Sequence, residues 1–228
     1  MNVAALIVAA GRGTRLGGDR PKQYIPIAGR CALRRSIERF LAHDKITTVL
    51  PVIHSDDRPL FDSATKGLQD HRFLPPVSGG QTRAETAKRG LEALGPYKPD
   101  VVLIHDAARP FVPKAVISRV IDALETVDGA FAALPVIDAM WRTDEGLAQA
   151  PVERADLWRA QTPQGFHFEK LKSAFATAPN DAADDVAVAW SAGLRVRAVL
   201  GDEASFKITF SEDLSRAKQF IELSKSEA

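Results

Sequence analysis

The sequence predicts a single α/β domain, in which a mostly parallel sheet is covered by helices on both faces. Segments typical of strands and of helices alternate along most of the chain, as they do in such sheets. Residues 2–9 are almost wholly apolar, as expected of a strand that is buried on both faces. The length of 228 residues suffices for one large domain, which we assign to residues 1–228.

The expected strands follow one another at intervals along the chain. After residues 2–9, the strand-like segments are 46–53, 101–104, 130–136 and 196–200. Because Pro51 cannot donate a hydrogen bond to a central ladder, its strand is expected to lie at an edge, to be bulged or to be short. His105 and Asp106 follow the strand 101–104 at its carboxyl end, where open α/β sheets bind ligands.

Apolar residues three and four positions apart predict helices between these strands. The apolar faces are formed by Leu33, Ile37, Phe40 and Leu41, by Ala84, Ala87, Leu91 and Leu94, and by Ile117, Val120, Ile121 and Leu124. A helix is also expected over 184–192, and Ser211 is the expected N-cap of a closing helix.

Residues 137–159 break the alternation of strands and helices. They mix charged residues with Gly146, Pro151, Trp141 and Trp158, and they have no clean period. We therefore expect an arm that protrudes from the domain and packs its aromatic rings against another surface.

The composition excludes several classes of protein. With 30 basic and 29 acidic residues and a net charge of +1, the chain lacks the basic field typical of nucleic-acid binding. The single cysteine, Cys31, excludes an intramolecular disulfide, and the histidines do not have the spacing of zinc ligands. No apolar run approaches the roughly 20 residues that span a bilayer, and the N-terminus lacks a signal-peptide pattern. We therefore expect a cytoplasmic protein with no membrane partner.

A glycine-rich turn follows the first expected strand. Gly11 and Gly13 allow the backbone to turn tightly, and the N–H groups of such a loop can surround phosphate oxygens. Arg15 offers a planar guanidinium for bidentate phosphate contact, and Lys22 a mobile charge. The spacing fits neither a P-loop nor a dinucleotide fingerprint. Taken alone, the segment could also be an ordinary turn with solvated basic residues.

Five segments, in this order and spacing, give the chain a recognisable pattern. They are Ala9 to Arg15 with Pro21 to Tyr24, Gly79 to Arg83, His105 to Pro110, Gln161 to Gln164, and Gly201 to Thr209. Together they resemble the 2-C-methyl-D-erythritol 4-phosphate cytidylyltransferases, and the resemblance covers essentially the whole chain. It implies the fold of nucleotide-diphospho-sugar transferases, and an enzyme that transfers a cytidylyl group from CTP in non-mevalonate isoprenoid synthesis.

The resemblance also implies how the reaction proceeds. A phosphate oxygen of methylerythritol phosphate attacks the α-phosphorus of CTP, and pyrophosphate leaves. A phosphomonoester is largely dianionic at neutral pH, with a second pKa of about 6, so no strong general base is needed. The enzyme aligns two anions and stabilises the developing charge. Mg²⁺ or another divalent cation is expected as cofactor, held mostly by the triphosphate, and we assign no protein ligands to it.

The family resemblance assigns roles to individual residues. The catalytic residues would be Arg15, Lys22, Arg154 and Lys207. The nucleotide would contact Ala9, Ala10, Gly11, Gly80, Gln81, Arg83, Thr86 and Ala107. The acceptor would contact Asp106, Arg109, Arg154, Thr162 and Lys207.

Simpler roles remain open for several of these residues. Lys22 would be a solvated lysine, Arg109 a structural arginine that ties its loop to a strand end, and Arg154 a partner of Glu153 or Asp156. We interpret His105 as a packing residue.

The chain departs from the usual family pattern at five positions, mostly on the acceptor side. Thr86 replaces serine, Ala139 and Ala183 replace threonine, Trp141 replaces lysine and Ser205 replaces asparagine. Loss of one hydrogen bond to a charged group would weaken binding by roughly 1.5–3 kcal/mol. The sister activity on ribitol 5-phosphate therefore stays open.

The family resemblance also implies partners. Arg154 would reach the acceptor phosphate in a neighbouring subunit, which implies a homodimer in which the arms complete the active sites. Two further alternatives are a non-catalytic nucleotide-binding module and one half of a bifunctional protein that is fused to another enzyme of the pathway.

Overall fold

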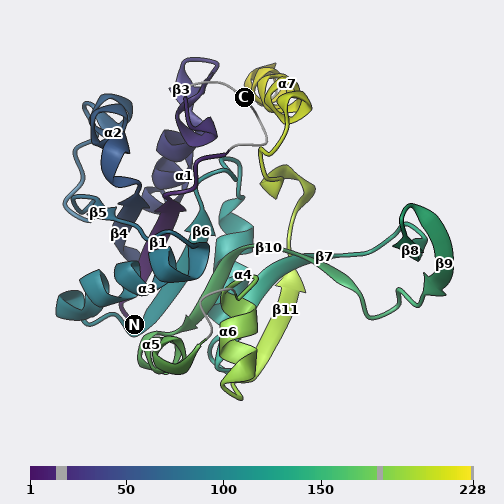
Figure 1. Cartoon of the computed structure of the whole chain (residues 1–228). Coiled ribbons are helices and arrows are strands. Elements are labelled where there is room, and N and C mark those ends of the chain that lie inside the picture. The colour runs from purple at the N-terminus through teal and green to yellow at the C-terminus, as the bar shows by residue number, and fades with distance from the viewer. Residues whose placement is uncertain (14–19, 179–181, 227–228) are drawn as a thin grey trace.

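The computed structural model describes residues 1–13, 20–178 and 182–226, and its central feature is a seven-stranded sheet (Figure 1). The strand order is β11-β7-β10-β6-β1-β4-β5. The bounds are β1 Val3–Ala9, β4 Ile46–Ile53, β5 Val77–Ser78, β6 Val101–Asp106, β7 Gly129–Pro135, β10 Trp158–His167 and β11 Val196–Leu200. Neighbouring strands are parallel except at β10, which is antiparallel to both β6 and β7. The predicted mostly parallel α/β fold is confirmed.

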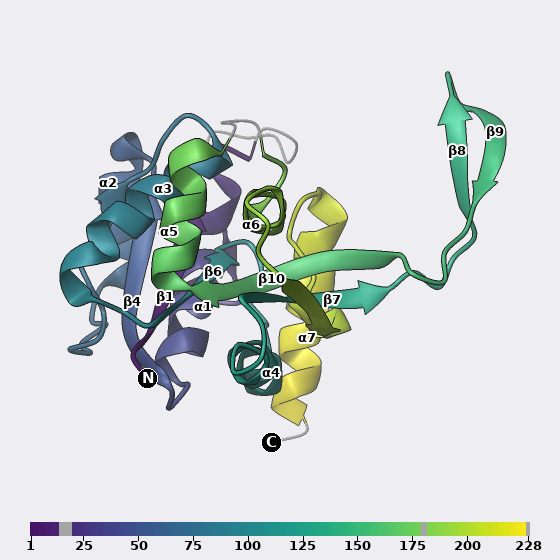
Figure 2. The ribbon, with the colours of Figure 1, turned by 90° about the horizontal axis from the view of Figure 1, so that it is seen from below.

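Helices cover both faces of this sheet (Figure 2). Their bounds are α1 Ala32–Leu41, α2 Arg58–Thr65, α3 Arg83–Leu94, α4 Lys114–Ala123, α5 Phe168–Thr177, α6 Asp185–Ser191 and α7 Ser211–Ser226. Short 3-10 turns are η2 Lys22–Tyr24, η3 Ser55–Asp57, η4 Gly95–Tyr97 and η5 Glu203–Ser205, and β2 Pro26–Ile27 pairs with β3 Arg30–Cys31. Within the described residues, no helix combines the length and apolar character needed to cross a membrane.

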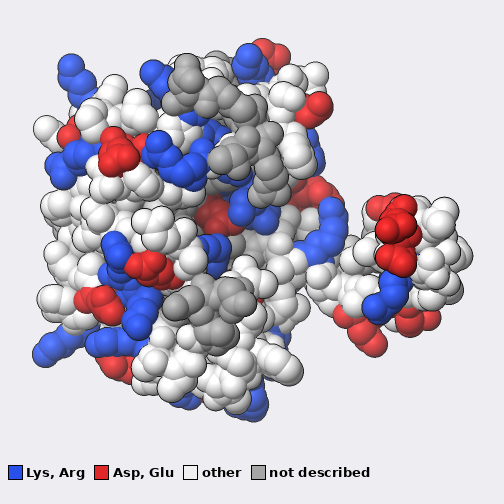
Figure 3. Space-filling view, viewed as in Figure 1, with Lys and Arg blue, Asp and Glu red and all other residues white. Residues whose placement is uncertain are grey.

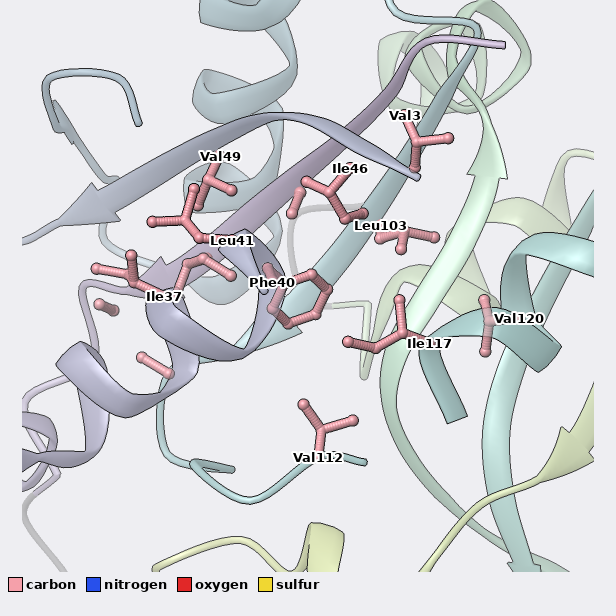
Figure 4. Close-up of a cluster of buried hydrophobic side chains, with 14 of the residues drawn as sticks. Val3, Ile37, Phe40, Leu41, Ile46, Val49, Leu103, Val112, Ile117 and Val120 are labelled. Atoms are coloured by element: carbon pink, nitrogen blue, oxygen red, sulfur yellow. The ribbon is translucent and has the colours of Figure 1, made fainter. Parts of the chain in front are cut away.

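Strand β1 shows why its sequence is apolar throughout. Val3, Ala5 and Ile7 pack into one cluster with α1 and α4, and Ala4 and Leu6 pack into another with α3, α5 and α6. Figure 4 shows part of the first cluster, in which Phe40 of α1 lies among side chains from the strands and from α4. Because successive side chains of β1 enter opposite faces of the sheet and both faces are buried, the side chains on each face must be apolar.

Pro51 does not shorten its strand, because β4 extends over all of Ile46–Ile53. On the outer side of β4, Val49 bonds to the segment 72–74, and Val52 and Ile53 pair with the two-residue β5. Pro51 lies between these contacts, next to the edge of the sheet, where its missing N–H disturbs no continuous ladder.

The predicted arm is a hairpin of β8 (Met140–Asp144) and β9 (Leu147–Val152), which projects from the domain (Figures 1 and 2). Its turn places Glu145 and Gly146 at φ +46° and +83°. The arm boundary at 159 was drawn too far along the chain, because Trp158 already begins β10. Trp141 and Leu147 are exposed on the hairpin.

Two further boundaries differ from the expectation. β6 continues through Asp106, so His105 and Asp106 are its last residues and do not follow it. Ser211 is the first residue of α7 and not its N-cap. Asp213, in the first turn, instead reaches back: its Oδ2 accepts the N–H groups of Thr209 and Phe210 at 2.8 and 2.9 Å, as the acidic residue of a capping box does.

Candidate active site

A cavity of about 280 Å³ opens where β1 and β6 end. Acidic and basic side chains gather side by side near the middle of this face of the molecule (Figure 3). Eleven of the predicted site residues line the cavity: Ala9, Ala10, Gly11, Lys22, Gly80, Gln81, Arg83, Thr86, Asp106, Ala107 and Lys207. They come from five separate segments of the chain, so the fold brings the predicted motifs together at the carboxyl ends of parallel strands.

The floor of the cavity is fixed by a buried glutamine. The Nε2 of Gln23 donates to the carbonyl oxygens of Ala9 and Gly11, at 2.7 and 3.0 Å. Gln23 follows Lys22 in η2, so these bonds join the end of β1 to the segment that carries Lys22. Gln23 therefore sets the distance between the glycine-rich turn and the lysine.

The opposite wall is the turn before α3, which forms a nearly complete capping box. Thr82 caps the helix by accepting the N–H of Glu85 at 3.1 Å, and Glu85 accepts the N–H of Gln81 at 2.8 Å. The N–H of Gly80 donates to Thr86 Oγ1 at 3.1 Å. The two N–H groups that were expected to contact the base therefore already have partners within the protein. The hydroxyl retained at Thr86 binds this turn.

Glycine is required where this turn approaches β1. A β-carbon on Gly79 would lie 2.5 Å from the β-carbon of Ala10 and 2.9 Å from Thr86 Oγ1. Both distances are shorter than van der Waals contact, so only glycine allows the two walls to approach this closely.

Asp106 is the electrostatic centre of the cavity. Its carboxylate lies 2.8 Å from Lys207 Nζ, 3.4 Å from Arg83 Nε and 3.9 Å from Arg109 Nε. Burial alone would raise the pKa of Asp106, but the three cations together hold it well below its usual value. Asp106 is therefore a carboxylate at neutral pH, and the three cationic side chains converge on it.

Arg83 joins this centre to a second buried acid. Its Nη2 lies 2.7 Å from Asp185 Oδ2, while Asp185 Oδ1 has no hydrogen-bond partner within the part of the chain that the structure describes. Burial raises the pKa of Asp185, and the charge of Arg83 opposes that shift. The pKa of Arg83 itself is raised, since the two carboxylates outweigh its own desolvation. Arg83 is thus a fixed cation at the cavity wall.

A buried network holds Asp106 from behind. The N–H of Asp106 donates to Thr162 Oγ1 at 3.1 Å, and that hydroxyl lies 2.9 Å from His105 Nδ1. His105 Nε2 lies 3.0 Å from the Arg109 carbonyl, which can only accept, so Nδ1 accepts the Thr162 proton. Burial lowers the pKa of His105 to about 4, which keeps the ring neutral. His105 packs against Phe40 at 4.8 Å between ring centroids, as its predicted packing role requires.

Arg109 and Thr162 do not line the cavity. Arg109 donates from Nη1 to the Ser205 carbonyl at 2.7 Å and thereby holds η5, two residues before Lys207. This contact is that of a structural arginine. Thr162 is buried beneath Asp106.

One predicted catalytic arginine lies away from the cavity. Arg154 is in the arm, where its guanidinium donates to the Ile137 carbonyl and its N–H donates to Glu153 at 2.9 Å. No ion pair from Arg154 to Glu153 or Asp156 is among those of the described residues. Arg15 lies outside the described residues. The described part of the chain contains no group of three or more His, Cys, Asp or Glu side chains that could hold a metal ion.

Sequence reasoning missed three residues that organise the site. Gln23 and Gln164 were part of the quoted motifs but received no role, and Asp185 was not singled out. Gln164 Oε1 accepts the Asp185 N–H at 3.1 Å, and its Nε2 donates to Asp184 at 2.9 Å. The signal for both amides was their place inside the quoted motifs, since a polar residue that is buried within a turn or strand needs hydrogen-bond partners there.

The family model for 2-C-methyl-D-erythritol 4-phosphate cytidylyltransferase, IspD, matches residues 3–223. The chain belongs to this family.

Individual IspD relatives agree with this assignment. The chain is 48% identical to a bifunctional IspD/IspF enzyme of Paramagnetospirillum magneticum over 93% of its own length, and it spans only 55% of that enzyme. It is 44% identical to a 2-C-methyl-D-erythritol 4-phosphate cytidylyltransferase of Cereibacter sphaeroides, covering 98% of both chains. A crystal structure of 4-diphosphocytidyl-2C-methyl-D-erythritol synthase superposes with a TM-score of 0.83 at 29% identity, covering 96% of this chain and 98% of the other.

Proposed function

We propose that the chain transfers a cytidylyl group from CTP to 2-C-methyl-D-erythritol 4-phosphate, giving 4-diphosphocytidyl-2-C-methyl-D-erythritol and pyrophosphate in non-mevalonate isoprenoid synthesis. The observation that carries this proposal is the cavity beside the glycine-rich turn, in which Arg83 and Lys207 contact Asp106 and which Lys22 also lines. Membership of the IspD family names the reaction.

The chemistry suits a site built from cations. An oxygen of the acceptor phosphate forms a bond to the α-phosphorus of CTP, and the bond from that phosphorus to the bridging oxygen breaks. Since a phosphomonoester is mostly dianionic at neutral pH, no side chain has to remove a proton. Lys22 and Lys207 would stabilise the charge that develops on the transferring and leaving oxygens. Arg15 is proposed to join them.

Mg²⁺ or another divalent cation would enter as a complex with CTP. Asp106 is the only carboxylate that the described residues contribute to the cavity lining, and it already contacts Lys207 at 2.8 Å and Arg83 at 3.4 Å. Such a carboxylate is a poor additional metal ligand, so the described lining residues do not form a protein metal site. We assign no step to the ion beyond neutralising the triphosphate.

Acceptor recognition is proposed to centre on Asp106, whose carboxylate would accept hydrogen bonds from hydroxyl groups of the acceptor. Arg109 and Thr162 would act through Asp106 and Lys207, because both are buried behind the cavity and contact those segments. They are therefore positioning residues in this proposal.

The exposed surface of the arm and the position of Arg154 on it support the proposal of a homodimer with shared active sites. The exposed apolar side chains of the arm, which include Met140, Trp141 and Leu147, have no covering element in the described chain. Arg154 lies on this projecting segment and does not line its own chain's cavity. We propose that the arm packs on a second copy, where Arg154 would approach the acceptor phosphate.

Two further proposals concern the whole protein. The bifunctional relative supports fusion to a second enzyme domain of the pathway, which the mass of the protein isolated from its source would test. A cytoplasmic location is supported by the single buried Cys31, which has no disulfide partner, and fractionation would test it.

The decisive experiment measures pyrophosphate release from CTP with Mg²⁺. Three reactions are compared: methylerythritol phosphate, ribitol 5-phosphate and no acceptor, each with the Lys207→Ala variant as control. Preference for methylerythritol phosphate is expected. Preference for ribitol 5-phosphate would show that ribitol 5-phosphate, and not methylerythritol phosphate, is the acceptor substrate. CTP binding without release of pyrophosphate in the presence of either acceptor would indicate a non-catalytic module.

A further inference from the structure

A second cavity, of about 360 Å³, lies beside the same η2 turn. Lys22 and Gln23 line the candidate active site, whereas Arg20 and Tyr24 line the second cavity. Its other walls are the β2–β3 turn, the start of α1 and the end of α2. The two cavities are thus adjacent but have no lining residue in common.

The lining of the second cavity is cationic. Arg20, Arg30, Arg34 and Lys66 line it, and none of the Asp or Glu residues that the structure describes does. The nearest compensation is Glu38, which Arg30 and Arg34 share at 3.0 and 2.7 Å. Among the described lining residues, four are thus cations, and Glu38 pairs with two of them.

The start of α1 adds to this positive field. Cys31 is the N-cap of this ten-residue helix and lines the cavity, and no side chain caps the helix there. Free N–H groups and the helix dipole at such an end favour an anion.

Tyr24 supplies an independent sign of a missing ligand. The residue lines the cavity and is 4% exposed, and its buried hydroxyl has no hydrogen-bond partner among the described residues. Burial, and after it the nearby Asp57, raise the pKa of Tyr24; Oδ1 of Asp57 pairs with Arg12 at 2.8 Å, and its buried Oδ2 has no hydrogen-bond partner among the described residues. A buried hydroxyl without a partner is costly, and an anion in the cavity would accept its proton.

We propose that the second cavity binds a phosphate dianion, either inorganic phosphate or the phosphate group of a small metabolite. This site is separate from the nucleotide cavity, and it does not depend on the proposed reaction. Arg30 and Lys66 supply mobile cations, Arg34 a buried one, and Tyr24 a neutral donor. Because Tyr24 and Lys22 belong to one 3-10 turn, an anion that binds Tyr24 also affects where Lys22 lies.

The test is a titration of the ¹⁵N-labelled chain with inorganic phosphate and, separately, with glycerol 1-phosphate, each against chloride at equal ionic strength. Saturable shifts are expected at the amides of Gly29 and Cys31, with secondary shifts at Lys22 and Gln23. The tighter of the two probes identifies the source of the phosphate. Shifts confined to Gly80 and Gln81, in the nucleotide cavity, would overturn the proposal.

Two variants decide the matter. Tyr24→Phe removes one hydroxyl and should weaken phosphate binding about threefold or more, and Arg30→Gln with Lys66→Gln should weaken it about tenfold or more. Lys45→Gln with Lys114→Gln removes the same charge elsewhere and should bind as the unaltered chain does. Unchanged binding in either test variant overturns the proposal. If the double variant fails to fold, Tyr24→Phe decides alone.

Discussion

Lys207 Nζ lies 2.8 Å from Asp106 Oδ2, although the two residues are 101 positions apart in the chain. This ion pair closes the cavity between the end of β6 and the segment after η5. It holds a cation in place before any nucleotide arrives. Preorganised charge of this kind is what phosphoryl and nucleotidyl transfer require.

Replacing Asp106 should separate its effect on CTP binding from its effect on acceptor binding. In Asp106→Asn, Lys207 and Arg83 lose a neutralising charge, so CTP should bind at least as tightly as before. The acceptor should bind more weakly, with its KM raised roughly tenfold or more, because a charged acceptor of its hydroxyl protons is lost. Steady-state kinetics with each substrate varied, together with CTP titration, measure this. Weaker CTP binding with unchanged acceptor KM would contradict the assignment.

The two cavity lysines should matter more for turnover than for binding. Lys22→Ala and Lys207→Ala are each expected to lower kcat by about 100- to 1000-fold, as the loss of a group that stabilises transition-state charge does. CTP binding should weaken only several-fold. Lys45→Ala, at the opposite end of β4, serves as the control. Near-equal losses in kcat and in CTP affinity would remove the transition-state role.

Subunit mixing tests the shared site. Neither Arg154→Ala nor Lys22→Ala should be active alone, but a heterodimer has one site with both residues intact. With random exchange, half of the dimers are mixed and half of their sites are intact, so about one quarter of the activity should return. Pyrophosphate release before and after exchange measures the recovery. No recovery despite proven exchange would count against arms that reach the partner.

His105 should make stability depend on pH. Its pKa is about 4 in the fold and 6.5 in the reference state, so the unfolded chain binds a proton first as the pH falls. The stabilisation is complete above pH 6.5 and is lost as the pH falls toward 4, by about 2 kcal/mol at pH 5. Urea unfolding at pH 7 and 5 measures it. His105→Gln should remove this loss of stability between pH 7 and 5. The control His71→Gln, at an exposed histidine, should keep it. Equal pH dependence of stability in both variants would refute the assignment of the effect to His105.

Lys98 offers a test of backbone strain away from the site. It has φ +46°, a left-handed conformation that residues with a β-carbon adopt at a cost. Lys98→Gly should raise the free energy of unfolding by about 0.5–1 kcal/mol, since glycine adopts this φ freely but loses more entropy on folding. Lys98→Ala keeps the β-carbon and should give no such gain. Equal stability of the two variants would show that the strain is absent.

The sequence was sufficient for most of the sheet and helices. β1 is apolar throughout, β4 and β11 are mostly apolar, and α1, α3 and α4 carry clear helical faces. The strand β10 was missed, since Gln161, Thr162 and Gln164 are polar residues buried within it. Its inward positions therefore lack apolar periodicity. In contrast, α5 was overlooked although Phe168, Leu171 and Phe175 have helical spacing.

The site was predicted as a set of residues but not as an arrangement. Motif order indicated which segments meet at the carboxyl ends of the strands. It could not show that Asp106 contacts Lys207 and Arg83, because these contacts depend on the packing of α3 and η5 against β6. Nor could it distinguish Arg109, buried against Ser205, from a cavity residue, since both kinds of arginine look alike in one sequence.

The place where the arm joins the domain has a consequence for how this architecture can vary. The chain leaves along β7 and returns along β10, which are hydrogen-bonded neighbours, and the N–H of Val136 bonds to the Leu157 carbonyl where they part. Insertions or deletions beyond that bond leave the register of the sheet unchanged. The sheet itself therefore sets no limit on the length of the hairpin, so any constraint on the arm comes from the surface that it contacts, whereas the strands beneath the cavity are constrained by their own packing.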